Sequence, residues 1–333
     1  MLGTILSLSS AATFGMNAAV VRRAVLSGTV IQGMAISLGV GLPFFIFASI
    51  LAGSFSQIWA FSTSNYFLLV TAGVIHFAFG RYCNYRAVKA MGGILVRPLQ
   101  NLSVILSLAL AIYFLGETLT PLRTLGIVLV LLGPLIMMRD HKNFTGKMHE
   151  KNNDTKKSRV KFVPNYTEGI IFGIASAIGF GSSPVLVRAA IGNLDYSIGI
   201  AGGVVSYSAA ALIVLVVISK PSTMRHVLTM SMTSFRWFSI GALLIGISQM
   251  LRYMALAIAP VSVVAPIQQT TIIFQVIFSW LINRDHEAFG LWIIFGICSS
   301  FLGAIALSVS TEFVLTHIDF PEFIVMFASI RWP

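Results

Sequence analysis

The 333-residue chain carries little charge. Asp, Glu, Lys and Arg together make up 10% of it, against about a quarter of an ordinary soluble domain. A soluble fold with so few charges would expose large apolar patches to water. The composition therefore excludes a cytosolic enzyme, a secreted domain and a disordered chain.

Cysteine and catalytic motifs are also scarce. Cys83 and Cys298 lie in apolar segments, outside any CxxC motif or Cys/His cluster, which predicts neither a metal site nor a disulfide framework. The chain lacks a Walker A loop, a Ser-His-Asp grouping and HxxxH or DDxxD-type clusters. These absences argue against an ATP-driven pump and a membrane enzyme. We therefore expect a non-enzyme without a cofactor.

Apolar residues dominate what is present. They make up 56% of the chain, and the mean hydropathy is +0.88. They fall into blocks of about 20 residues, the length that crosses a hydrocarbon core. We therefore predict an all-α polytopic membrane protein with ten transmembrane helices, at about 4–24, 30–53, 66–88, 92–113, 120–138, 168–190, 196–219, 237–258, 261–282 and 289–310.

The formal net charge is +11. Because the basic residues lie mainly in loops between apolar blocks, they indicate membrane topology and contact with anionic lipid rather than binding of nucleic acid. The first apolar block has no basic segment before it and runs into Arg22 and Arg23. It is interpreted as a retained span rather than a cleaved signal peptide.

The two halves of the chain repeat one another. Offsets of 166 to 170 residues align Gly, Ala, Arg, Tyr, Pro, Gln and Glu in one unbroken order. Chance agreement is easy for Gly and Ala in apolar helices, but not for the other types. The aligned pairs include Gly3–Gly169, Gly15–Gly181, Arg22–Arg188, Tyr85–Tyr253, Pro98–Pro266, Gln100–Gln268 and Glu117–Glu287.

Each repeat holds an odd number of predicted spans, five. The second repeat must therefore enter the membrane from the opposite side, which makes the two repeats inverted. Many secondary transporters use this architecture, because a site at the repeat interface can face either side of the membrane. We predict repeats at 1–138 and 167–310, a basic polar linker at 139–166, and an interfacial or packed tail at 311–333.

Both repeats resemble the EamA domain of the drug/metabolite transporter superfamily. The first carries Tyr85-x-Ala87, Pro98, Leu115-Gly116-Glu117-Thr118, Gly126 and Gly133, and the second carries Tyr253-x-Ala255, Pro260, Ser262, Pro266, Glu287, Gly296 and Gly303. The resemblance implies a ten-helix, exporter-like carrier with a central cavity, for substrates from amino acids and other metabolites to drugs. Arg97 and the run Arg284–Glu287 depart from the usual pattern.

The side of the membrane that the termini face stays open. Loops after odd-numbered predicted spans hold 16 Lys and Arg residues, and the other loops and the tail hold four. The positive-inside rule would place both termini outside the cytoplasm. The family resemblance implies the opposite, so only a shared side for the termini is predicted.

Arg97 is the first candidate for the substrate cavity. An intramembrane Arg usually faces a cavity, where it would hold a carboxylate or phosphate, unless it reaches the interface by snorkelling. The aligned Pro98 and Pro266 interrupt backbone hydrogen bonding, either to bind substrate or as packing kinks. The remaining cavity candidates are polar or aromatic and lie on the same spans or on the first: Gln100, Asn101, Gln268, Gln269, Tyr85, Tyr253 and Asn17.

Four residues are candidates for coupling or gating. His76 titrates near neutral pH and Arg81 follows it, although a single buried His is commonly structural. Glu117 and Glu287 precede the fifth and tenth spans, where a carboxylate in a first helical turn is favoured by the helix dipole. That structural role is the first interpretation, ahead of proton carriage or gating.

These features together predict a secondary carrier, an exporter of small metabolites such as amino acids or related polar or anionic compounds, working by alternating access. We expect it in the plasma or inner membrane, with a small-molecule substrate and lipid as its partners and no nucleic acid. A multidrug efflux carrier and a non-transporting receptor or scaffold are the alternatives. The sequence does not predict an oligomeric state.

Overall fold

The computed structural model describes residues 1–25, 28–91, 93–133, 136, 165–282, 291–309, 321–323, 326 and 329–332. Helices make up most of this described part, and its β structure is limited to one isolated bridge between Leu119 and Trp332. The predicted all-α class is confirmed. The expected linker at 139–166 lies almost wholly outside the described residues, as does much of the tail.

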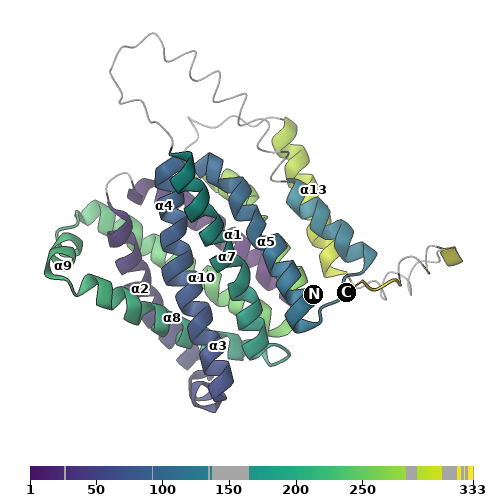
Figure 1. Cartoon of the computed structure of the whole chain (residues 1–333), viewed down its shortest axis with the longest axis horizontal. Coiled ribbons are helices and arrows are strands. Elements are labelled where there is room, and N and C mark those ends of the chain that lie inside the picture. The colour runs from purple at the N-terminus through teal and green to yellow at the C-terminus, as the bar shows by residue number, and fades with distance from the viewer. Residues whose placement is uncertain are drawn as a thin grey trace, which may run out of the picture.

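The helices of the first half begin at the N-terminus and are joined by short connections (Figure 1). They are α1 (Leu2–Val25), α2 (Val30–Leu51), the 3₁₀ helix η1 (Phe55–Ala60), α3 (Thr63–Gly73), the π-helical η2 (Val74–Gly80), α4 (Arg81–Met91), α5 (Gly93–Leu115) and an apolar helix at Pro121–Gly133.

The second half is also helical and includes a short surface helix, α9. It contains α7 (Tyr166–Ile191), α8 (Tyr196–Ile218), the short α9 (Pro221–Leu228), α10 (Met232–Ile258), α11 (Val261–Gln268), α12 (Thr271–Ile282) and α13 (Leu291–Ser308).

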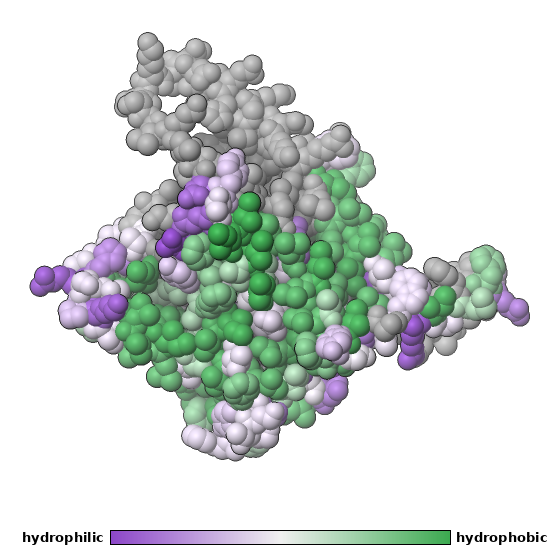
Figure 2. All heavy atoms as spheres, viewed as in Figure 1, coloured by the Kyte–Doolittle hydropathy of each residue, from purple (hydrophilic) through white to green (hydrophobic). Residues whose placement is uncertain are grey.

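Five described helices are long and apolar enough to cross a membrane, at Ile31–Leu51, Thr63–Ala87, Tyr166–Ile191, Tyr196–Ile218 and Met232–Ile258. Every range predicted as a span contains a helix of the described structure, although several of these helices are shorter. Hydrophobic residues cover most of the described surface on the visible face (Figure 2). The number of spans stays a prediction.

The range predicted as a single span at 261–282 is two helices. Backbone N–H groups of Gln269 and Thr270 bond to the carbonyls of Pro266 and Ile267, three residues back, at 2.9 and 3.0 Å. The hydroxyl of Thr270 also donates to the Ile267 carbonyl, at 2.7 Å. These tight local bonds end α11 soon after a proline, which has no N–H of its own to continue the helix.

Polar side chains define where several helices begin. Ser62, Asn165, Asp195 and Ser231 each accept a hydrogen bond from a backbone N–H in the first turn of the following helix. Such caps satisfy N–H groups that lack a partner within the helix. At Asp195, hydrogen bonds from Ser197 lower the pKa of the carboxyl because they favour its ionised form.

The two halves pack together through their first helices. α1 lies against α10, α11 and α12, while α7 lies against α3, α4 and α5, and α2 lies against α8. Glycines allow these approaches. A Cβ on Gly15 would lie 2.7 Å from the backbone nitrogen of Gln275 in α12, and one on Gly181 would lie 2.6 Å from the Ser103 carbonyl in α5. Any side chain at either glycine would therefore force the two helices apart.

Gly73 gives the most severe close approach to backbone in the described structure. A Cβ there would lie 2.2 Å from the carbonyl oxygen of Ser206 in α8, and the Ser206 hydroxyl in turn donates to the Leu69 carbonyl at 2.7 Å. We expect Gly73→Ala to lower the free energy of unfolding by about 1–3 kcal/mol, because α3 and α8 must separate. Thermal unfolding of the detergent-purified protein measures this change.

Gly39 in α2 supplies the matched control, because a Cβ there meets nothing within 4 Å. Gly39→Ala should leave stability unchanged or raise it by up to about 1 kcal/mol, since Ala favours the helix. Equal unfolding temperatures for the two variants would contradict the close packing of α3 on α8.

Candidate functional site

A buried polar cluster joins the two halves near the middle of the continuous helix that runs from α3 to α4. His76 in η2 is 6% exposed, and Arg252 in α10 is 8% exposed. One guanidinium nitrogen of Arg252, Nη1, lies 3.2 Å from Nε2 of His76 and donates to Oε1 of Gln249 at 3.4 Å. Because a guanidinium only donates hydrogen bonds, Nε2 of His76 acts as the acceptor.

The π-helical turn positions His76 within this cluster. Its i→i+5 bonding widens the helix, a rare geometry that recurs at functional sites. The imidazole packs between the rings of Phe77 and Phe180, with ring centroids 4.7 and 4.9 Å away. These contacts come from η2 and α7, so aromatic rings from both halves enclose the imidazole.

A second buried guanidinium lies in the same region. Arg81 begins α4, is 7% exposed, and donates from Nη1 to the hydroxyl of Ser37 in α2 at 2.7 Å. Its guanidinium carbon lies 5.5 Å from the centre of the Phe77 ring, a favourable cation–π geometry. The charges of Arg81 and Arg252 both act on His76 and on Tyr207, so the two guanidinium groups share one cluster.

Tyr207 of α8 and Tyr253 of α10 complete the cluster. Both are fully buried, and Phe45 packs against each, with ring centroids 4.6 Å from Tyr207 and 6.5 Å from Tyr253. Within the described part, neither hydroxyl has a hydrogen-bond partner of normal geometry. The candidate Tyr253 is therefore packed inside the protein.

A separate polar group links α1, α10 and α11. Ser10 and Ser248 exchange hydrogen bonds with each other's backbone carbonyls at 2.7 and 2.8 Å. Gln268 accepts from the Ser10 hydroxyl at 3.4 Å and donates to the Ser7 carbonyl at 3.1 Å. Gln268, a cavity candidate, thus bonds between helices of the two halves.

The other candidates are distributed around these groups. Gln100 in α5 donates to Asn84 in α4, and Asn17 in α1 is buried with its carbonyl oxygen unpartnered in the described part. Pro266 is buried within α11. Tyr85, Asn101 and Gln269 are half-buried. The side chains of Arg97 and Pro98, both in α5, lie outside the described residues, as does Glu287.

Glu117 caps a different helix from the one expected. The predicted first-turn position is wrong, because the following helix begins at Pro121. The carboxylate instead accepts hydrogen bonds from the backbone N–H groups of Val261, at 2.7 Å, and Ser262, at 2.8 Å. It therefore holds the N-terminus of α11, where the helix dipole favours negative charge.

Arg188 holds the neighbouring helix end. It donates from Nη1 to the carbonyls of Leu256 and Ala257 at 2.9 and 2.8 Å, and from Nη2 to Oδ1 of Asn193 at 2.7 Å. These carbonyls are among the last of α10, where the helix dipole favours a cation. A cation thus caps the end of α10, and an anion, Glu117, caps the start of α11.

Residues 1–139 match the model of the EamA-like transporter family. The match covers less than half of the chain, and it indicates a multi-pass membrane transporter of the drug/metabolite type, surrounded by lipid and acting on a small molecule.

The chain is also similar in fold to a solved crystal structure. The likeness has a TM-score of 0.65 and covers 91% of this chain and 95% of the other, at 14% sequence identity. At that identity the match supports the fold alone. No curated protein matches the chain.

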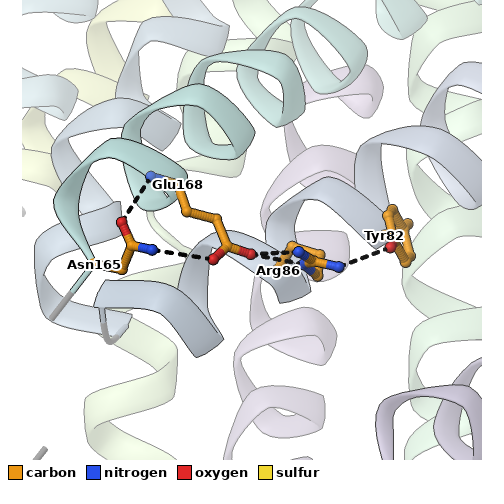
Figure 3. Close-up of polar contacts among 4 residues, drawn as sticks. All are labelled: Tyr82, Arg86, Asn165 and Glu168. Carbon is orange, nitrogen blue, oxygen red and sulfur yellow. Dashed lines mark hydrogen bonds and ion pairs between the residues drawn. The ribbon is translucent and has the colours of Figure 1, made fainter. Parts of the chain in front are cut away.

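An ion pair at one end of the helical bundle joins the first half to the start of the second (Figure 3). Arg86 of α4 donates from Nε to Oε1 of Glu168 at 3.0 Å, and Glu168 also bonds to the helix cap Asn165. The two side chains are 43% and 32% exposed. At such exposure a pair contributes about 0–1 kcal/mol, so it aligns α4 with α7 rather than holding them together.

Two grooves lie on the described surface away from the predicted site residues, and the central cavity stays a prediction. A groove of about 550 Å³ between η1, α3 and α8 is lined mostly by apolar residues such as Trp59, Tyr66 and Leu212. A second, of about 510 Å³, lies along α9. Neither groove is lined by a predicted site residue.

Sequence reasoning missed Arg252, Tyr207 and Arg188 as site or junction residues. Arg188 and Arg252 were counted with the loop charges, although they lie within α7 and α10. The charge asymmetry used for topology therefore includes residues that lie inside helices, these two among them. A signal was present for Arg252: it follows a run of apolar residues directly beside the repeated Tyr253.

We expect Glu117→Ala to lower the free energy of unfolding by about 1.5–3 kcal/mol, since two backbone N–H groups lose a charged acceptor. Glu117→Gln should lower the free energy of unfolding by a smaller amount, because an amide oxygen still accepts one of these bonds. Urea or thermal unfolding in detergent measures both changes. Glu322→Ala, at an exposed carboxylate, is the control, and equal stability of Glu117→Ala and this control would refute the cap.

Proposed function

We propose that the chain is a secondary transporter that exports small polar or anionic metabolites, such as amino acids or related compounds, by alternating access. In this proposal ten spans form two inverted five-helix repeats at 1–138 and 167–310. The linker at 139–166 joins them, and residues 311–333 form the tail. The plasma or inner membrane is the proposed location.

The observation that carries this proposal is the contact between His76 and Arg252. It buries titratable and charged groups where a helix of the first half meets a helix of the second. Ionisable groups within spans are expensive and commonly mark a substrate or ion pathway. Inverted-repeat transporters place their sites at this kind of interface.

The packing of the two halves supports inverted repeats. With the offsets found in the sequence, α1 is equivalent to α7, α4 to α10, and α5 to α11 and α12. The observed packing respects these equivalences, since α1 lies on α10 and α12 while α7 lies on α4 and α5. The aligned Gly15 and Gly181 contact equivalent helices. Two states in which the two halves exchange their conformations would therefore have similar energies.

In this mechanism the polar centre binds substrate when one set of helices separates and releases it when the other set separates. Ser10, Ser248 and Gln268 hold α1 against α10 and α11 in the conformation seen here. Opening on that side would exchange these hydrogen bonds for bonds to water or substrate. The hydrogen-bonding groups remain satisfied in both states, which keeps the energy difference small.

Counterflow in proteoliposomes tests the proposal. We expect the purified protein to exchange at least one labelled compound from a panel of amino acids, carboxylates, sugar phosphates, nucleotides and cationic drugs without an ion gradient. Gln268→Leu should slow this exchange about tenfold, the equivalent of one lost hydrogen bond of about 1.4 kcal/mol. A directional gradient then measures export and the driving ion.

Gln57→Leu is the matched control, because Gln57 lies in η1, away from the polar centre, and it should exchange at the wild-type rate. Folded protein that exchanges no member of the panel would contradict transport and favour a receptor or scaffold. Exchange restricted to the cationic drugs would favour a multidrug carrier.

A further inference from the structure

We propose that Arg252 and Arg81 form an oxyanion-binding site, so that the transported compound carries a carboxylate or phosphate group. This inference rests on the proposed transport function and names its substrate class. It assigns the anion to two described guanidinium groups on α10 and α4, one from each half.

The charges within the described structure show why an anion is needed. Arg252 and Arg81 are both more than nine-tenths buried, and neither forms an ion pair with a described carboxylate. The described acids are engaged or exposed elsewhere: Glu117 on α11, Glu168 with Arg86, Asp195 with Ser197, and Glu322 at the surface. Buried charges are normally paired, so two uncompensated cations in a membrane-type bundle call for an external counter-charge.

The unsatisfied hydrogen-bonding groups have the chemistry of an oxyanion site. Four of the buried atoms without a partner in the described part belong to this cluster: Nη2 of Arg252, Nδ1 of His76 and the hydroxyls of Tyr207 and Tyr253. Nη2 is a donor, and the hydroxyls can donate. Nδ1 of a neutral His76 carries the ring proton, because Nε2 accepts from Arg252. Four available donors beside two cations match the several acceptor lone pairs of a carboxylate or phosphate.

The repeat explains why the two arginines come from different halves. The offset of 168 that aligns Tyr85 with Tyr253 also aligns Arg81 with Gln249 and Asn84 with Arg252. Each half thus carries one arginine and one amide, three residues apart on one helix, in opposite order. In α10 this pair makes the hydrogen bond from Arg252 to Gln249. An anion between the halves would contact one arginine from each.

The same charges disfavour a cationic substrate. A positive ligand near Arg252 and Arg81 would meet repulsion in a low-dielectric interior, where charge interactions are much stronger than in water. The site therefore selects for anions over cationic drugs of similar size. A neutral compound would leave both arginines uncompensated.

Binding of inorganic phosphate and of acetate to the full chain tests the site. The protein is purified in detergent with phosphatidylcholine alone, and binding is measured by calorimetry and by the shift in unfolding temperature. We expect wild type and Arg225→Gln, a change at an exposed arginine on α9, to bind at least one of these anions. Choline chloride should bind to neither protein.

Arg252→Gln should weaken anion binding about tenfold or more, because a charged, forked donor is lost. Arg252→Lys should weaken it less, since charge remains without the fork, and Arg81→Gln should also reduce affinity. If Arg252→Gln does not fold, Arg252→Lys and Arg81→Gln carry the comparison. Unchanged affinity in the folded variants, or no anion binding by wild type, would overturn the proposal.

Two further arms separate this proposal from the transport function and from lipid binding. Arginine-dependent anion binding without counterflow of any anion would confirm the site and reject transport, whereas counterflow of neutral compounds alone would retain transport and reject the anion. Adding phosphatidylglycerol distinguishes the source. If only this lipid binds, and binding requires Arg252, the ligand is a lipid headgroup and the substrate assignment is rejected.

Discussion

Charge within an apolar bundle is the constraint on which the centre of this structure depends. A guanidinium inside a membrane-type fold needs hydrogen-bond partners, aromatic rings or a counter-ion. Arg252 and Arg81 receive the first two from His76, Gln249, Ser37 and Phe77. The π-helical η2 and the close packing of α3 on α8 place these groups together. The described residues do not supply a counter-charge for either arginine.

At the junction between α10 and α11, backbone groups with partial charges need partners for the same reason. A helix that ends inside a bundle leaves unpaired carbonyls, and one that begins there leaves unpaired N–H groups. Arg188 and Glu117 satisfy one set each. Because Glu117 belongs to the first half and α11 to the second, this cap also ties the halves together. A junction held by side chains can open by exchanging hydrogen bonds, without unfolding either helix.

The interface between halves combines two kinds of contact with different consequences. Glycine contacts, such as those of Gly15 with α12 and of Gly181 with α5, bring backbones together without polar partners. Serine and glutamine contacts around Ser10 and Gln268 depend on hydrogen bonds that water can replace. The first kind favours sliding of packed helices, and the second favours a defined closed state. The proposed alternating access would use both properties in one interface.

The sequence by itself determined the membrane class, the helix positions and the EamA resemblance, because apolar block length and residue order are one-dimensional properties. It also selected His76, Arg81, Tyr253, Gln268 and Asn17, which are buried or bonded between helices in the structure. Only the tertiary structure showed that Arg252 lies beside His76, 176 residues away in sequence, and that Glu117 caps α11 and not its own following helix. Partners of that kind are set by which helices pack together. The burial of its side chain then decides whether an arginine is a surface charge or part of a site. That burial depends on the helices packed around the residue, which the neighbouring sequence does not specify.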